Sequence, residues 1–118
     1  MNSNRSKFIP RVALSALALV AAAATLAAAG GEAAFRAENR AAMDKMMAAM
    51  MIKPSGDVDR DFVAMMVPHH QGAIDMAQAE LRYGRNAQLR RIAQQIIAAQ
   101  QQEIPTMRRA LEQPTGAR

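Results

Sequence analysis

The chain contains no cysteine and no tryptophan, and only 3% of its 118 residues are aromatic. Without cysteine it can form no disulfide, no thiolate metal site and no redox thiol. Nucleic-acid binding needs basic patches and stacking rings, and a net charge of +5 with so few aromatic side chains gives it little support. The length allows one small domain. The abundance of alanine, methionine, glutamine and arginine favours helices over strands.

The first 29 residues have the pattern of an export signal. A short basic segment precedes an alanine-rich apolar run, Val12–Ala29, which ends in small residues before Gly30. This run is at the lower length limit for a membrane span, so a retained anchor is the alternative. We predict a signal peptide over residues 1–29, an exported domain over residues 30–118 and a periplasmic or secreted location. Contact with a membrane is expected only if the signal segment is retained.

Three helices are predicted in the exported part. Breaks near Lys53–Gly56 and Tyr83–Asn86 separate segments with helical apolar periodicity, and these segments cover residues of about 33–51, 59–83 and 87–112. The second break is short, so the last two helices should form an antiparallel hairpin. The sequence therefore predicts an all-α fold, a small bundle of three long helices.

Residues suited to helix termini support these boundaries. Asp57 or Asp59 can cap the start of the second helix, and Asn86 the start of the third. Gly84 is a suitable residue for the end of the second helix. The turn between the two helices is therefore expected to be tight.

The segment Asp61–Glu80 contains both histidines of the chain, next to each other. At helical spacing several of its residues fall on one line, and they are Phe62, Met65, Met66, His69, Ala73, Met76 and Glu80. We predict that this line is the buried face, with His70 beside it and Pro68 on the outer face. An imidazole would then lie among thioethers.

The third helix carries two polar interruptions, Gln100 and Glu103, within its apolar stripe. Opposed residues of an antiparallel hairpin lie equally far from the turn, and the expected neighbours are His69 with Gln100, Met66 with Glu103, and Phe62 and Met65 with Met107. The polar residues of one helix thus face the histidine and methionine cluster of the other. This coincidence predicts a binding site between the two helices.

Thioethers are soft ligands and imidazole is borderline, so a methionine and histidine site suits Cu(I), and Ag(I) by the same logic. Cu(II) is an alternative through the two histidines. The candidate ligands share one hairpin and helical spacings of one or two turns, and they are Met65, Met66, His69, His70, Met76 and Met107. Glu103 is expected to hold the second nitrogen of an imidazole.

A second methionine stripe follows helical spacing in the first predicted helix, and it consists of Met43, Met46, Met47, Met50 and Met51. Methionine at such positions often fills gaps in a core. The stripe is alternatively a third wall of the site, or a second site, so Met43, Met46, Met47 and Met50 are predicted as additional ligands.

Other interpretations are weaker or remain open. The chain has no Glu-x-x-His pair for a carboxylate di-iron centre, no His-Glu-x-x-His zinc motif and no nucleophile with a nearby base, so we expect no enzyme. A Zn(II) or Ni(II) site of His69, His70 and Glu103 is one alternative. The other is an interaction module that uses its methionine faces for a partner helix or a membrane and binds no metal.

The stretch MMVPHHQGAIDMA from Met65, followed by QQQEIPTM from Gln100, resembles the family called domain of unknown function 305, whose better-studied members are CopM-like exported copper-binding proteins. The resemblance covers about Asp59–Leu111. It implies a ferritin-like helical bundle, a copper ligand, and a role in copper buffering, tolerance or transfer to a partner protein. The ligands that it implies are Met65, Met66, His69, His70, Met76 and Met107, with Glu103 as a supporting acid. A ferritin-like domain has four helices, and this chain has room for three, which predicts a three-helix bundle or a homodimer that completes a larger one.

Overall fold

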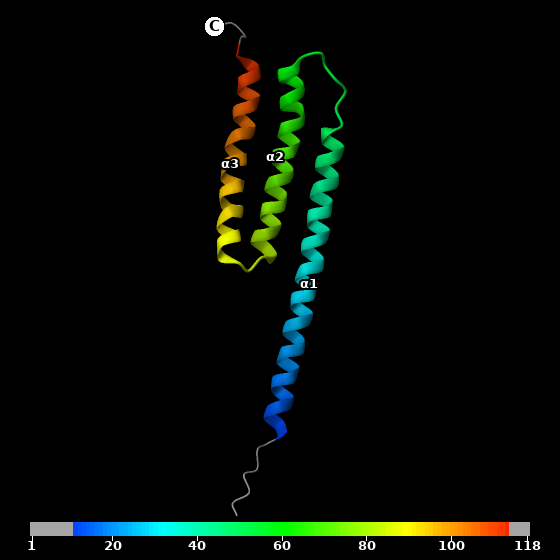
Figure 1. Cartoon of the computed structure of the whole chain (residues 1–118), viewed down its shortest axis with the longest axis vertical. Helices are drawn as coiled ribbons and strands as arrows, with labels where there is room; N and C mark the ends of the chain where they lie inside the picture. The colour runs from blue at the N-terminus through cyan, green and yellow to red at the C-terminus, as the bar shows by residue number, and fades with distance from the viewer. Residues whose placement is uncertain (1–10, 114–118) are drawn as a thin grey trace, which may run out of the picture. The chain divides into compact units, whose positions relative to one another are not determined.

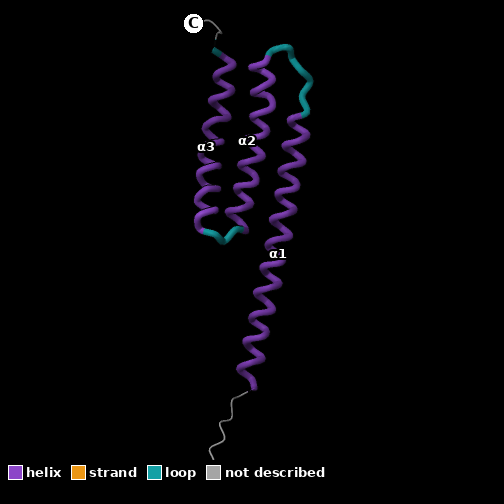
Figure 2. The backbone as a smooth tube through the Cα atoms, in the orientation of Figure 1, coloured by secondary structure: helices purple, strands orange, loops and turns teal. Residues whose placement is uncertain are grey.

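The computed structural model describes residues 11–113, and within them the chain forms three α-helices and no strand. They are α1 (Arg11–Met50), α2 (Val58–Tyr83) and α3 (Ala87–Glu112). The predicted all-α fold with a hairpin of the last two helices is confirmed (Figures 1 and 2). The first ten residues, with most of the basic segment of the predicted signal, lie outside the described part.

The ends of α2 and α3 are fixed by the capping residues that the sequence indicates. The Asp57 carboxylate accepts hydrogen bonds from the backbone N–H groups of Asp59 and Arg60, at 3.0 and 3.2 Å. The Asn86 side chain does the same for Gln88 and Leu89, at 2.9 and 3.0 Å. These bonds satisfy backbone donors that have no partner inside a helix. They explain why both predicted starts lie within a residue of the observed ones.

The start of α1 differs from the prediction. We expected the first helix of the domain to begin near Ala33, after two glycines, but α1 begins at Arg11 and includes Gly30 and Gly31. Alanine has the highest helix propensity, and each glycine costs only about 1 kcal/mol relative to it, so the alanine-rich run outweighs the two glycines. Among the described residues, no helix is both long and apolar enough to cross a bilayer.

The chain divides into two compact units, residues 1–31 and 32–118, and every contact described below lies within the second unit. In this unit α2 packs against both α1 and α3 (Figure 1). The core consists mainly of small side chains, and its buried members are Ala42, His70, Gly72, Ile74, Ala77, Ala79 and Ala93. No large side chain among the described residues is fully buried. Alanine and glycine at the contacts allow the helix backbones to approach closely.

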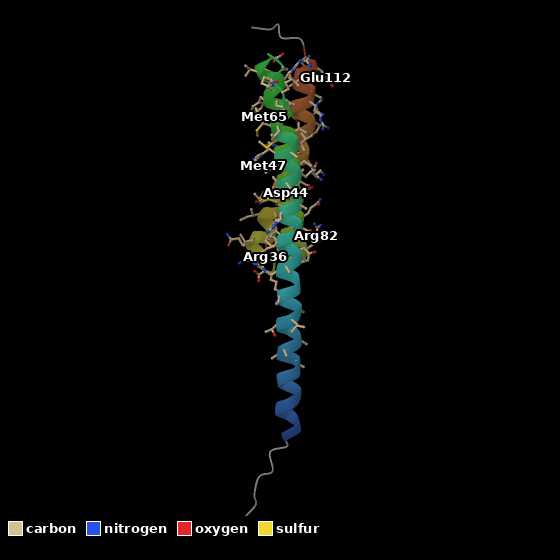
Figure 3. The ribbon with its side chains drawn as sticks, turned by 90° about the vertical axis from the view of Figure 1, so that its right-hand side faces the viewer. Arg36, Asp44, Met47, Met65, Arg82 and Glu112 are labelled. Atoms are coloured by element: carbon tan, nitrogen blue, oxygen red, sulfur yellow. The ribbon has the colours of Figure 1, made fainter. Side chains whose placement is uncertain are left out.

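Hydrogen bonds at the end of α2 hold it against α1. The Glu38 carboxylate accepts from Arg82 Nε at 2.9 Å and from the Tyr83 hydroxyl at 2.7 Å. The Tyr83 and Arg82 hydrogen bonds hold the pKa of the Glu38 carboxyl below its usual range, and the bond to Glu38 raises the pKa of the Tyr83 phenol. Arg82 is labelled in Figure 3, alongside α1.

Further along the interface between α1 and α2, Gly72 of α2 lies against the side chain of Met46 of α1. A Cβ atom at Gly72 would come 2.7 Å from the Met46 Sδ and 3.0 Å from its Cβ. Together with Ala42 and Pro68, the two residues line a cavity of about 70 Å³. Pro68 therefore faces α1, and the prediction that it lies on the outer face is wrong. The periodicity of α2 cannot indicate this, because α2 has a neighbour on each of two sides.

Candidate metal site

A buried imidazole marks the interface between α2 and α3. The Nε2 atom of His70 lies 2.7 Å from Oε2 of Glu103. The His70 side chain is 9% exposed, whereas that of Glu103 is 57% exposed. A carboxylate accepts hydrogen bonds only, so Nε2 carries the proton, and in the neutral ring Nδ1 keeps its lone pair. Glu103 thus selects the tautomer of His70, as predicted for an imidazole nitrogen next to this acid.

Two buried acceptor atoms beside this pair have no hydrogen-bond partner in the described protein. They are Nδ1 of His70 and Oε1 of Gln100, which lies one turn before Glu103 on α3. Buried polar atoms in folded proteins are nearly always paired, and an unpaired one costs about 1–3 kcal/mol. Both atoms suit a cation or a hydrogen-bond donor. The donor set therefore fits a metal ion that accepts an imidazole nitrogen.

One expected pair of neighbours in the hairpin differs in the structure. Glu103 was expected opposite Met66, but it contacts His70. The buried side of α2 also differs from the predicted line: His70 and Ile74 are buried, whereas Phe62 is 52% exposed. The prediction that the line of Phe62 and His69 forms the buried face is therefore wrong. The cause is again the two neighbours of α2, since its apolar side chains are divided between α1 and α3.

The other residues predicted on the hairpin do not all gather around His70. His69 is exposed, and its ring centroid lies 6.2 Å from that of His70. Met66 and Met76 on α2 and Met107 on α3 are half-buried. Met107 lines a groove with Phe62, as predicted. Met65 lies in a different groove, which it shares with α1.

The methionines of α1 divide into three environments. Met43 and Met47 are exposed, at 50% and 57%. Met46 packs on Gly72, which gives it a role in helix packing. Met50 lines one groove with Met51 and with Met65 of α2. Met51 was not among the predicted ligands, although it follows Met50 directly at the end of the predicted stripe.

The described residues offer fewer ligands for harder metal ions such as Zn(II) and Ni(II). No group of three histidine, aspartate or glutamate side chains among residues 11–113 lies close enough to hold one ion. The alternative Zn(II) or Ni(II) site of His69, His70 and Glu103 therefore has no preformed cluster in this part of the chain. The unpaired donors are the His70 imidazole nitrogen, which is borderline, and the Gln100 amide oxygen, which is hard. The soft donor nearest in sequence is the thioether of Met66, one turn before His70 on α2.

The structure defines a small all-α domain whose central helix carries a buried histidine hydrogen-bonded to a glutamate of the adjacent helix. The family model described as "Domain of unknown function (DUF305)" matches residues 14–111, and the chain belongs to this family. The match extends beyond the resemblance seen in the hairpin and includes most of α1. No curated protein matches the chain.

Proposed function

We propose that this protein binds Cu(I), or Ag(I) in its place, through histidine and methionine side chains, as an exported protein for copper buffering, tolerance or transfer. The observation that supports the proposal is the buried Nδ1 atom of His70, which has no partner while Glu103 fixes the other nitrogen. A neutral imidazole held in this way has one lone pair free for a metal ion.

His70 is the proposed anchoring ligand. Met66 lies one turn before it on α2, and the half-buried thioethers of Met76 and Met107 are the other proposed ligands from the hairpin. We propose that the protein binds and releases copper and catalyses no reaction. The partners that follow are the metal ion, a protein that receives it and a second copy of the chain.

The test is a Cu(I) competition titration of the whole chain and of two single variants. We expect His70→Ala to weaken binding by at least the roughly 10–100-fold that loss of an outer ligand partner costs. His69→Ala is the matched control, because it removes an adjacent but exposed imidazole, and we expect a much smaller change. Circular dichroism confirms that both variants remain helical. Unchanged Cu(I) affinity in a helical His70→Ala variant would exclude the proposed site.

One observation favours a second candidate function, an interaction module without metal. The structure exposes several large apolar side chains on α1, α2 and the loop between them, among them Met43, Met47, Met51, Phe62 and Met65. Met47 and Met65, on different helices, lie on the same side of the ribbon in Figure 3. Such a surface suits a partner helix or a second copy. Metal-dependent stabilisation separates the two functions, because only an ion that prefers the folded state raises the unfolding temperature.

A further inference from the structure

The closed end of the α2–α3 hairpin combines exposed apolar side chains with positive charge. The turn between the two helices forms this end (Figure 2). Residues 81–92, which include the turn, contain four arginines and no aspartate or glutamate. Leu89 and Ile92, in the first turns of α3, are 51% and 42% exposed. We define the tip surface as Arg85, Leu89, Arg91 and Ile92.

The two arginines of the tip surface have no acidic partner in the described part of the chain. Arg85 and Arg91 are exposed, and neither forms a salt bridge there. Two acids lie at the same end of the hairpin. Glu38 is hydrogen-bonded to Arg82, and the Glu80 side chain lies against the turn at the end of α2. The guanidinium groups of the tip surface therefore remain available to an external anion.

The backbone of the turn is already hydrogen-bonded. Arg90 donates to the carbonyls of Leu81 and Gly84, at 2.6 and 3.0 Å, and the Gly84 N–H donates to the Glu80 carbonyl at 2.7 Å. The Asn86 side chain accepts from the first N–H groups of α3. Polar backbone groups that are paired in this way lose no hydrogen bond when the turn leaves water for a less polar phase.

The pattern of the tip surface suits a bilayer better than a second protein. Leu89 and Ile92 lie about 60° apart around α3, with Arg91 beside them. Aliphatic side chains of this kind enter the headgroup region, while neighbouring arginines extend to phosphates. A stable protein interface takes roughly 20–30 residues from each partner, and the tip surface has four. Its positive charge is complementary to anionic lipid headgroups.

We propose that the tip surface binds membranes that contain anionic phospholipids. Arg85 and Arg91 contact lipid phosphates, and Leu89 and Ile92 insert between the headgroups. The contact requires neither a metal ion nor a retained signal segment, so it is independent of the proposed copper function. It keeps the exported domain at a membrane surface by one end of its hairpin and leaves the opposite end in water.

The test uses an introduced indole, because the chain has no tryptophan of its own. Leu89→Trp reports from the tip surface. The matched control is Val58→Trp, at an 83% exposed position at the opposite end of α2. Each whole-chain variant is titrated with vesicles of phosphatidylcholine and phosphatidylglycerol, and with vesicles of phosphatidylcholine alone.

We expect the fluorescence of Leu89→Trp to shift to shorter wavelength with the vesicles that contain phosphatidylglycerol, and brominated acyl chains should quench it. Phosphatidylcholine alone should have little effect. The fluorescence of Val58→Trp should stay that of an indole in water with both kinds of vesicle, even where the signal segment attaches the chain to them.

The role of charge is measured in the Leu89→Trp background. Arg85→Gln together with Arg91→Gln should weaken binding by roughly 25-fold, because each arginine near an anionic surface contributes roughly 5-fold. The control pair is Arg108→Gln with Arg109→Gln, which removes the same charge from exposed positions at the other end of α3 and should change binding much less. Circular dichroism checks that all variants remain helical.

Three results would overturn the proposal: no response of Leu89→Trp to anionic vesicles, an equal response of Val58→Trp, or equal effects of the two arginine pairs. Soluble polyglutamate is the further control for an acidic protein partner. A response of Leu89→Trp to polyglutamate but not to vesicles would reject the membrane and identify an acidic polypeptide as the partner of this surface.

Discussion

The imidazole of His70 is the most unusual single residue of the domain, because it is a polar group in a core otherwise made of alanine, glycine and isoleucine. Its Nε2–Glu103 bond offsets the cost of burial at one nitrogen only. A structural histidine is expected to satisfy both nitrogens. The unpaired Nδ1 atom is the observation on which the proposed metal site rests.

Removal of the Glu103 carboxylate should destabilise the fold. In Glu103→Ala, the buried Nε2–H of His70 has no acceptor in the described protein, and we expect a loss of about 1–3 kcal/mol in the free energy of unfolding. Urea unfolding followed by circular dichroism measures this. Glu112→Ala, an exposed glutamate of the same helix, is the control and should change stability by less than about 0.5 kcal/mol. Equal effects of the two variants would contradict a structural role of the pair.

The close approach of Met46 to Gly72 predicts that alanine at position 72 lowers stability, although helix propensity alone predicts that it raises stability. Alanine in place of an interior glycine of a helix normally stabilises it by about 0.5–1 kcal/mol. In Gly72→Ala the new methyl group would lie within 3.1 Å of three Met46 atoms, including Cβ, which cannot rotate away. Overpacking of this kind costs about 1–3 kcal/mol, so the variant should be less stable.

A thermal unfolding series tests this contact. The variants are Gly72→Ala, Met46→Ala and the double variant. Met46→Ala removes the Sδ and Cγ atoms but keeps Cβ, so it should relieve part of the clash that Gly72→Ala creates. A Gly72→Ala variant as stable as the native chain, or more stable, would show that α1 does not approach α2 as closely as described.

Among the elements, the boundaries of α2 and α3 could be predicted from the sequence, whereas the start of α1 and the rotation of α2 could not. Asp57 and Asn86 are local signals, since each acts on N–H groups two and three residues ahead. The orientation of α2 depends on both neighbouring helices at once. A prediction of a single buried line therefore placed Phe62 and His69 in the core, whereas both are exposed.

The N-cap of α3 should contribute measurably to stability. Asn86→Ala removes the acceptor of two backbone hydrogen bonds, and the expected loss is about 0.5–2 kcal/mol. The control is Gln88→Ala, which changes an exposed residue two positions further along the chain. Chemical unfolding distinguishes them, and equal stability of the two variants would contradict the capping role of Asn86.

At the scale of the whole domain, the polar contact between α1 and the hairpin in the described part of the chain is the cluster at Glu38. The Tyr83 and Arg82 hydrogen bonds lower the pKa of Glu38. Its contribution to stability is therefore present at neutral pH and is lost as the pH decreases through that lowered pKa. Glu38→Gln should weaken this dependence on acid.

Tyr83 reports on the same cluster, since it is the only tyrosine and the chain has no tryptophan. The hydrogen bond to Glu38 raises the pKa of its phenol. An absorbance titration of the phenol should therefore give a midpoint above that of free tyrosine, and Glu38→Gln should return it toward the ordinary value. Since the folded state retains the phenol proton, this contribution to stability is lost as the pH increases above the ordinary tyrosine pKa. A native midpoint at the ordinary value would mean that α1 does not dock here.

The most direct test of metal binding by this domain is a ¹⁵N NMR measurement on the two histidine rings during addition of Ag(I) or Cu(I). With only His69 and His70 in the chain, each ring nitrogen can be assigned. We predict that Nε2 of His70 is protonated before addition, and that the Nδ1 signal of His70 shifts on binding while the His69 signals change little. Unchanged His70 nitrogens at saturating metal, or a response confined to His69, would contradict a metal site at the buried imidazole.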